Sequence, residues 1–272
     1  MQPTTFKKWV SVTELTAWNY CARKLFIQKI LKISPKLNKA MLMGKLKHQI
    51  LEVFSKNEEN IVRNIDKDYD KLELVFIYED FIIKMGDQIF HENEKAIANF
   101  DINRDELIKK VLKDFSYDLK LRVTSIKEKL KQGIFGEKLW ASLDSLFVSE
   151  LKLESSELGL RGRVDRVEIV KSTNEIIPYE VKNREDKVYH SDEIQLGAYA
   201  LLLEEHYKTQ VRRAFIESGD NRQEILITPE LRKEVLELIE RIRNMENSPP
   251  PAMQSNFKKC QSCEFQSECM QM

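Results

Sequence analysis

The chain has 272 residues, of which 42% are hydrophobic and 32% are charged, so it can form one large core or a core with an elaboration. Its 44 lysines and arginines balance its 44 aspartates and glutamates, which excludes a global basic field for nucleic acid but permits a local basic groove. No apolar run approaches the roughly 20 residues of a membrane-spanning helix, and the N-terminus lacks a signal-peptide pattern. We therefore expect a cytoplasmic protein without a membrane segment.

Helices are predicted for the first half of the chain. Ser11 and Glu14 have the spacing of a capping box, which predicts a helix that begins there and ends near residue 30. The segment 39–56 predicts a second helix from its apolar periodicity. Residues from about 56 to 147 are rich in good helix formers and predict a mostly helical middle region.

The second half of the chain alternates strand and helix patterns. Strands are predicted, in chain order, within 147–171 and at 175–183, 211–218 and 223–229. A helix is predicted at 191–207, capped by Ser191 or Asp192, and another begins at Thr228 and Pro229. This order predicts a mixed α/β core with helices at both chain ends.

A carboxylate and an ammonium interrupt the apolar strand IIPYEVKN. Alternate side chains of a strand share a face, so Glu180 and Lys182 point to the same side. The preceding strand carries Asp165, and the short connection between the two strands predicts a hairpin. If Val170 lies opposite Glu175, then Asp165 lies opposite Glu180. A slip by one residue would send one acid to the other face unless a bulge restored it.

Two acids and a lysine in this arrangement have two interpretations. The acids would repel each other unless a cation lay between them, and Mg²⁺ or Mn²⁺ prefers such oxygen ligands. Lys182 could then help to activate a water and stabilise charge on a scissile phosphate. The alternative is an exposed strand face with cross-strand ion pairs.

The cysteines indicate a second metal site. The chain contains four of them: Cys21, Cys260, Cys263 and Cys269. In a reducing compartment, four cysteines indicate a metal site before disulfides. Three lie in a polar tail, which is poor material for a hydrophobic core. Four thiolates suffice for zinc or for a [4Fe–4S] cluster, and the residues alone leave both open.

The order of the motifs resembles the RecB-like branch of the PD-(D/E)xK nuclease superfamily. Asp165 followed by EVK at 180–182 is similar to the superfamily signature. GKLKH at 44–48 is similar to the glycine-x-x-x-histidine motif of the branch, and QLGAY at 195–199 to its glutamine-x-x-x-tyrosine motif. The segments YCARKLFI and KCQSCEFQSEC resemble the CRISPR-associated iron–sulfur exonucleases, the fourth Cas protein family.

The resemblance implies a restriction-endonuclease-like α/β fold, with a mixed sheet flanked by helices and a cluster that joins the two chain ends. It also implies four regions. These are N-terminal helices at 1–55, a helical insertion or cap at 56–146, a nuclease core at 147–228, and a C-terminal helix with the cysteine-rich segment at 229–272.

The same resemblance implies roles for individual residues. The expected metal ligands are His48, Asp165, Glu180 and the backbone carbonyl of Val181. The expected catalytic residues are Asp165, Glu180, Lys182, Gln195 and Tyr199, of which the last two would help to hold the DNA or the lysine. The expected [4Fe–4S] ligands are Cys21, Cys260, Cys263 and Cys269.

A neutral chain must bind DNA through local basic groups. The candidates are Arg23, Arg161, Arg163 and Arg184. Arg161 and Arg163 share the strand parity of Asp165, which would place their guanidinium groups where phosphates lie beside the metal. The alternative for these residues is solvated surface charge.

The family implies an exonuclease that uses Mg²⁺ or Mn²⁺ on single-stranded DNA ends, 5′ to 3′, and trims spacer precursors for the CRISPR adaptation integrase proteins. One alternative is a RecB-like nuclease of repair or of a virus. Others are a non-catalytic DNA-end-binding module and a zinc-stabilised or redox-sensing binding protein. The intact set of Asp165, Glu180 and Lys182 argues against both non-catalytic alternatives.

Overall fold

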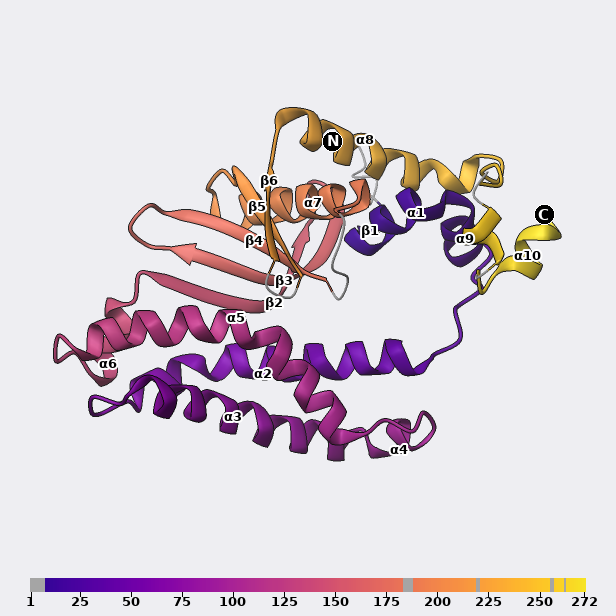
Figure 1. Cartoon of the computed structure of the whole chain (residues 1–272). Coiled ribbons are helices and arrows are strands. Elements are labelled where there is room, and N and C mark those ends of the chain that lie inside the picture. The colour runs from indigo at the N-terminus through magenta and orange to yellow at the C-terminus, as the bar shows by residue number, and fades with distance from the viewer. Residues whose placement is uncertain (1–7, 183–187, 219–220, 255–256, 262) are drawn as a thin grey trace.

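A six-stranded mixed sheet lies at the centre of the computed structural model (Figure 1). The structure describes residues 8–182, 188–218, 221–254, 257–261 and 263–272. The strands are β1 (Val10–Ser11), β2 (Ser145–Ser155), β3 (Leu160–Val170), β4 (Glu175–Val181), β5 (Arg213–Ser218) and β6 (Asn221–Leu226). This architecture confirms the predicted mixed α/β class.

Helices cover both faces of the sheet. They are α1 (Val12–Lys29), α2 (Lys39–Arg63), α3 (Lys71–Glu92), α4 (Glu94–Ala98), α5 (Arg104–Leu130), α6 (Gly136–Ser142), α7 (His190–Tyr207), α8 (Pro229–Arg243), the 3-10 helix Asn244–Asn247, α9 (Phe257–Gln261) and α10 (Gln266–Met270). In Figure 1, α7 and α8 lie above the sheet, and α2, α3 and α5 lie below it. None of the helices in the described ranges has the length and apolarity that crossing a bilayer requires.

The strand order places the two predicted acids on neighbouring strands. The sheet runs β1-β3-β4-β5-β6, and β2 pairs with the other edge of β3. β3 and β4 are antiparallel, with Val170 opposite Glu175, which confirms the predicted register. Continuing this register by one step beyond the last pair, Arg166 and Tyr179, brings Asp165 opposite Glu180.

Strand pairing is interrupted at Asp165. β2 and β3 pair on both sides of Glu150 and Asp165 but not at these two residues, and Glu150 has a left-handed backbone with φ of 59°. A non-glycine residue in this conformation is uncommon, and inside a strand it marks a local strain of the kind that active sites often contain. The other edge of β3 pairs with β1 at Arg161 and with β4 from Arg166 onward. Within the described chain, Asp165 therefore lies in a gap on both edges.

Two separate hydrophobic cores stabilise the fold. The first forms where α1, α7 and α8 pack on the sheet, and it includes Leu15, Val164 and Leu203. The second lies among α2, α3, α5 and α6 and is built around aromatic side chains, with the rings of Phe54 and Phe115 4.7 Å apart. The helical layer formed by α2, α3, α5 and α6 thus has a core of its own and covers one face of the sheet (Figure 1).

Two details differ from the sequence predictions. The helix predicted at 39–56 continues to Arg63, because Glu58 and Val62 are buried on its inner face. The N-cap of α7 is Tyr189 rather than Ser191 or Asp192. Asp192 instead stands at the third helical position, where its carboxylate accepts the backbone N–H of Tyr189 at 2.8 Å.

The close packing of α1 on β3 gives a first prediction. A Cβ atom on Gly162 would lie 2.6 Å from Cγ2 of Val12, so Gly162→Ala is expected to cost about 1–3 kcal/mol through overpacking. Nothing lies within 4 Å of the corresponding atom at Gly44, inside α2, so Gly44→Ala is expected to stabilise by about 0.5–1 kcal/mol. Urea unfolding midpoints measure both changes. Equal effects of the two substitutions would contradict the described packing.

Candidate active site

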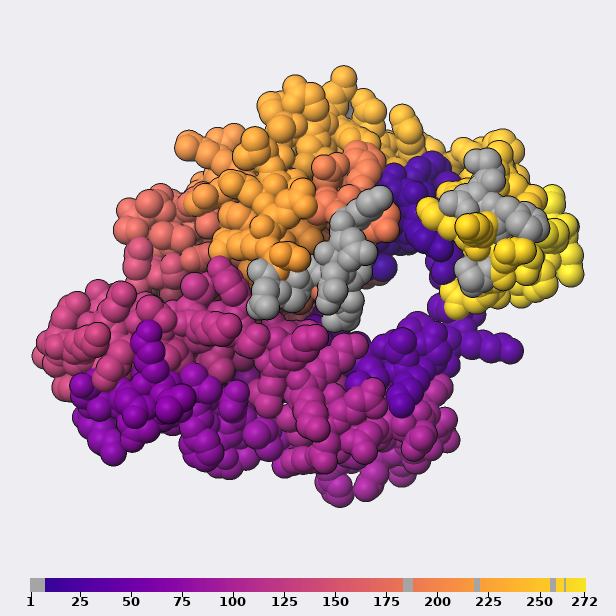
Figure 2. Space-filling model, in the orientation of Figure 1, coloured from indigo at the N-terminus to yellow at the C-terminus, as the bar shows by residue number. Residues whose placement is uncertain are grey.

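A cavity of about 350 Å³ lies between the helical layer and the sheet. α2 and α5 line one side, while β2, β3, β4 and α7 line the other. Val12 and Thr13 at the start of α1 complete the wall. Figure 2 shows an opening in this view of the molecule between α2 and the body that α1 forms with the C-terminal segment. Residues of both α1 and α2 line the cavity.

A hydrogen-bond network joins four of the predicted catalytic residues. Nζ of Lys182 donates to Glu180 Oε1 at 2.8 Å and to Gln195 Oε1 at 3.0 Å. Nε2 of Gln195 donates to Glu180 Oε2 at 2.7 Å and to the hydroxyl of Tyr199 at 2.9 Å. The side-chain amide of Gln195 therefore orients both Glu180 and Lys182. The carboxylate of Asp192 lies 3.4 Å from Lys182 Nζ and adds a second acid beside the ammonium.

Glu180 and Asp165 face the same side, as the hairpin register requires. Oδ2 of Asp165 accepts the backbone N–H of Val181 at 3.1 Å. Burial of Glu180, and after it the negative charge of Asp165, raise the pKa of Glu180 to about 8. Burial likewise raises the pKa of Tyr199 well above its usual value, so that its phenol is neutral. The cavity thus holds crowded carboxyl groups away from water.

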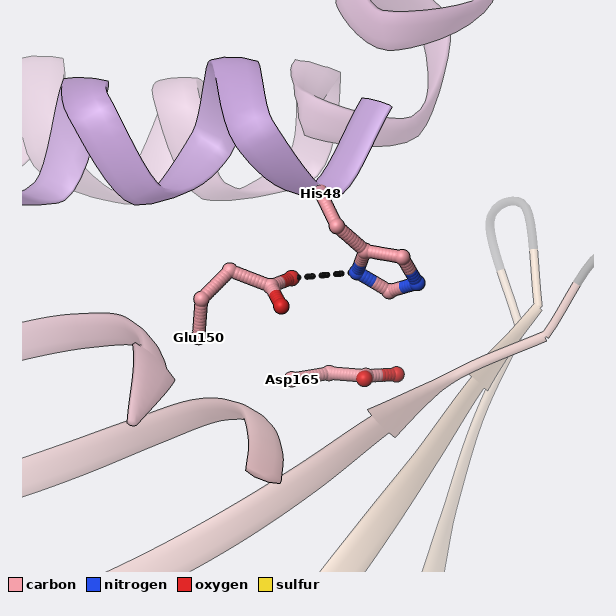
Figure 3. A group of neighbouring side chains, drawn as sticks. All are labelled: His48, Glu150 and Asp165. Carbon is pink, nitrogen blue, oxygen red and sulfur yellow. Dashed lines mark hydrogen bonds and ion pairs between the residues drawn. The ribbon is translucent and has the colours of Figure 1, made fainter. Parts of the chain in front are cut away.

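Three side chains that can hold a metal ion meet across the cavity, one from α2 and two from the strands β2 and β3 (Figure 3). One ligand atom each of His48, Glu150 and Asp165 lies within 4.8 Å of the others. His48 Nδ1 lies 2.6 Å from Glu150 Oε1, so Nε2 is the ring nitrogen that can bind an ion. Imidazole and carboxylate donors suit Mn²⁺, and carboxylates suit Mg²⁺.

Glu150 was not identified from the sequence. Its side chain is 1% exposed, burial raises its pKa, and Arg163 forms an ion pair with it at 3.2 Å. The available signal was a single acid inside the apolar run FVSELKL, on the strand before Asp165. The left-handed backbone at Glu150 breaks the alternation that would have assigned it a face.

The predicted DNA-binding arginines lie in different environments. Arg163 lines the cavity, whereas Arg161 is exposed and is not among the described lining residues. Arg23 is only 9% exposed and contacts the C-terminal segment, which places its guanidinium away from an open surface. Arg184 lies outside the described residues.

The structure brings the four cysteines to one small cavity of about 30 Å³ between α1 and the C-terminal segment. Cys21 lies at a kink where the α1 backbone leaves helical geometry. Nε of Arg23 donates to Cys269 Sγ at 3.1 Å, and its NH1 donates to the carbonyl of Pro251 at 2.8 Å. The two ends of the described chain thus meet around free thiols.

Comparison with known proteins identifies a family. A sequence model of the PD-(D/E)XK nuclease superfamily matches residues 9–270. The CRISPR-associated exonuclease Cas4 of Francisella tularensis subsp. novicida (strain U112) is 26% identical over 120 residues, which cover 44% of this chain and 60% of that relative. A crystal structure of SSO0001 matches 65% of this chain and 77% of its own at 18% identity, with a TM-score of 0.30 that carries no structural argument.

The raised pKa of Glu180 predicts how stability depends on pH. Its protonated form is favoured in the folded state, so the metal-free protein should lose stability as pH rises from about 4.5 to about 8. Glu180→Gln should flatten this slope, because an amide does not titrate. Added Mg²⁺ should raise the melting temperature of the wild type more at pH 8 than at pH 5. Identical pH slopes for the two proteins in EDTA would contradict the assignment.

Proposed function

The chain belongs to the PD-(D/E)XK nuclease superfamily, and we propose that this member is a metal-dependent exonuclease of single-stranded DNA ends. One observation carries the proposal. The cavity holds a histidine–carboxylate group that suits a divalent cation, and Lys182 donates to Glu180 and Gln195 of the cavity wall. Metal, acid and ammonium are the groups that hydrolysis of a phosphodiester needs.

The proposed metal ligands are His48, Asp165, Glu180 and the carbonyl of Val181. Glu150 extends this set, because one of its oxygens lies within 4.8 Å of ligand atoms of His48 and Asp165. Its contact with His48 Nδ1 also fixes the orientation of the ring. A divalent cation held there would supply the Lewis acidity that lowers the pKa of an attacking water and neutralises charge on the phosphate. The donor set fits such an ion, because three ligand atoms already converge without one.

Lys182 is the proposed catalytic cation. Its ammonium lies 2.8 Å from Glu180 and 3.4 Å from Asp192, and these contacts restrict its motion. From this position it would stabilise the negative charge that develops on the phosphate. Gln195 holds Lys182 and Glu180 in one arrangement, and Tyr199 supports Gln195 from the next turn of α7.

Single-stranded ends are the proposed substrate. The cavity of about 350 Å³ lies between the helical layer and the sheet, which suits a flexible strand better than a duplex. Arg163 at its wall would contact a phosphate. The similarity to an exonuclease named Cas4 supports action from ends, and we retain the proposed 5′ to 3′ direction.

CRISPR adaptation is the proposed context. The matched relative is named as CRISPR-associated, which favours spacer-precursor processing with the adaptation integrase proteins over repair or viral roles. The match spans 60% of that relative, so this context and its partners are proposals for this chain.

We further propose that the four cysteines hold a [4Fe–4S] cluster. In a tetrahedral zinc site, with Zn–S bonds of about 2.3 Å, sulfurs lie about 3.8 Å apart. Among the described residues, only His48, Glu150 and Asp165 bring three candidate ligand atoms within 4.8 Å of one another. No three cysteine sulfurs are therefore this close together. The wider spacing favours the larger cluster.

Nuclease assays test the catalytic proposal. With Mg²⁺ or Mn²⁺, Glu180→Ala and Lys182→Ala are each expected to slow degradation of end-labelled single strands about 10²-fold or more. Lys152→Ala is the matched control, because this exposed lysine of β2 pairs with Glu52 and should keep the wild-type rate. Circular single strands should resist cleavage. Wild-type rates in both active-site variants would refute the catalytic assignment.

Metal analysis tests the cluster proposal. Protein purified without oxygen should contain iron and sulfide and absorb visible light, and Cys21→Ala should lose this absorbance and unfold at lower temperature. Ser267→Ala is the control in the same C-terminal segment, since its hydroxyl bonds Glu268 rather than a sulfur. Zinc without iron in the wild type would decide against the cluster. So would a Cys21 variant that stays folded and active with unchanged absorbance.

A further inference from the structure

Buried charges lie at the contact between the helical layer and the sheet, beside apolar packing of Leu146 of β2 against the helical core. The two large cores are otherwise separate. Within the helical layer, Lys47 of α2 pairs with Asp114 of α5 at 2.5 Å beside the cavity. Deeper in the contact, Arg166 of β3 forms an ion pair with Asp118 of α5.

Arg166 is clamped from three directions. Its NH1 donates to Asp118 Oδ1, and its NH2 lies 2.6 Å from Oε1 of Glu217 on β5. Its guanidinium carbon lies 4.1 Å from the centre of the Tyr179 ring on β4. Arg166, Asp118 and Glu217 are all buried. One cation therefore joins the helical layer to three neighbouring strands.

This clamp lies next to the position of β3 that has no ladder partner. Arg166 directly follows Asp165, whose position lies in the gap of strand pairing on both edges of β3. The backbone carbonyl of Glu217 also accepts the backbone N–H of Lys182 at 2.8 Å. Glu217 therefore contacts both Arg166 and the residue that follows β4. Arg166 is itself paired with Ser149 and Tyr179 in the ladder, so the clamp holds the first paired residue after this gap.

We propose that Asp118, on the helical layer, is a positioning residue that fixes Asp165 through Arg166 and thereby sets the metal site. The proposal rests on the proposed nuclease function and assigns the helical layer a part in it. Asp118 also lines the cavity, so the helix that positions the acid forms the wall facing it. Loss of its charge would free Arg166 and allow Asp165 to shift from His48 and Glu150.

A second buried pair provides a matched comparison. Glu58 of α2 pairs with Arg122 of α5, four residues after Asp118 on the same helix. Both members are 4% exposed, and the pair contacts the Phe54 and Phe115 rings of the helical core. Glu58→Gln and Asp118→Asn are therefore the same chemical change at similar burial. Glu58→Gln leaves the ion pairs of Arg166, the residue that follows Asp165, in place.

The test measures Mn²⁺ binding directly, by electron paramagnetic resonance of the free ion, and then cleavage kinetics. Asp118→Asn is expected to weaken Mn²⁺ binding about tenfold, as changes to outer-shell partners of metal ligands do. It should also lower kcat with little change in the KM for DNA. Glu58→Gln should lower the melting temperature to a similar degree but leave Mn²⁺ affinity and kcat at wild-type values.

Two results would overturn the proposal. One is wild-type Mn²⁺ affinity in folded Asp118→Asn, and the other is equal weakening in Asp118→Asn and Glu58→Gln. If Asp118→Asn does not fold, the triple variant Asp118→Leu, Arg166→Met, Glu217→Gln is measured, since it leaves no buried charge unpaired. It should show the same weakening, and wild-type affinity in it would refute the clamp.

The two readouts separate this proposal from the proposed function. Wild-type protein that binds Mn²⁺ but does not cut single-stranded ends would contradict the function, while its Mn²⁺ affinity would still test Asp118. Wild-type cleavage together with unaltered Mn²⁺ binding in Asp118→Asn would contradict the positioning role alone.

Discussion

The crowding of carboxyl groups in one cavity is the constraint on which the rest of this structure depends. Burial raises the pKa values of Glu150 and Glu180, so both groups are costly to ionise unless positive charge stands near. The protein supplies Arg163 to one acid and Lys182 to the other. A divalent cation would supply the remaining compensation, so folding and metal binding are expected to be coupled at this site.

The helical layer follows from the same constraint. An entirely apolar contact with the sheet would bury the acids without partners, whereas a largely separate core leaves charged partners at the contact between the layers. Buried ion pairs add little net stability, because desolvation offsets most of their attraction, but breaking one is costly. They therefore define how the layers sit on each other. In this chain the Asp118–Arg166 pair fixes that arrangement one residue from Asp165.

The sequence predicted the sheet side of the site better than the helical side. The hairpin register followed from a short connection and from period-two placement of acids, and Val170 does lie opposite Glu175. The QLGAY spacing correctly placed Gln195 and Tyr199 on one helix face near Glu180. Glu150 was not predicted as a site residue, because its left-handed backbone breaks the alternation of side chains along the strand. Asp118 was not predicted, because no local sequence pattern relates a helix residue to a strand residue 48 positions away.

One helix connects the two proposed metal sites. α1 contributes Val12 and Thr13 to the wall of the cavity and carries Cys21 at its kink. Its first turn fits β3 so closely that Gly162 has no room for a side chain. Arg23, two residues after the cysteine, is bound to the C-terminal segment through Cys269 and Pro251. Val12, which packs on Gly162, and Cys21 thus belong to one helix, which joins the wall of the cavity to the cysteine site.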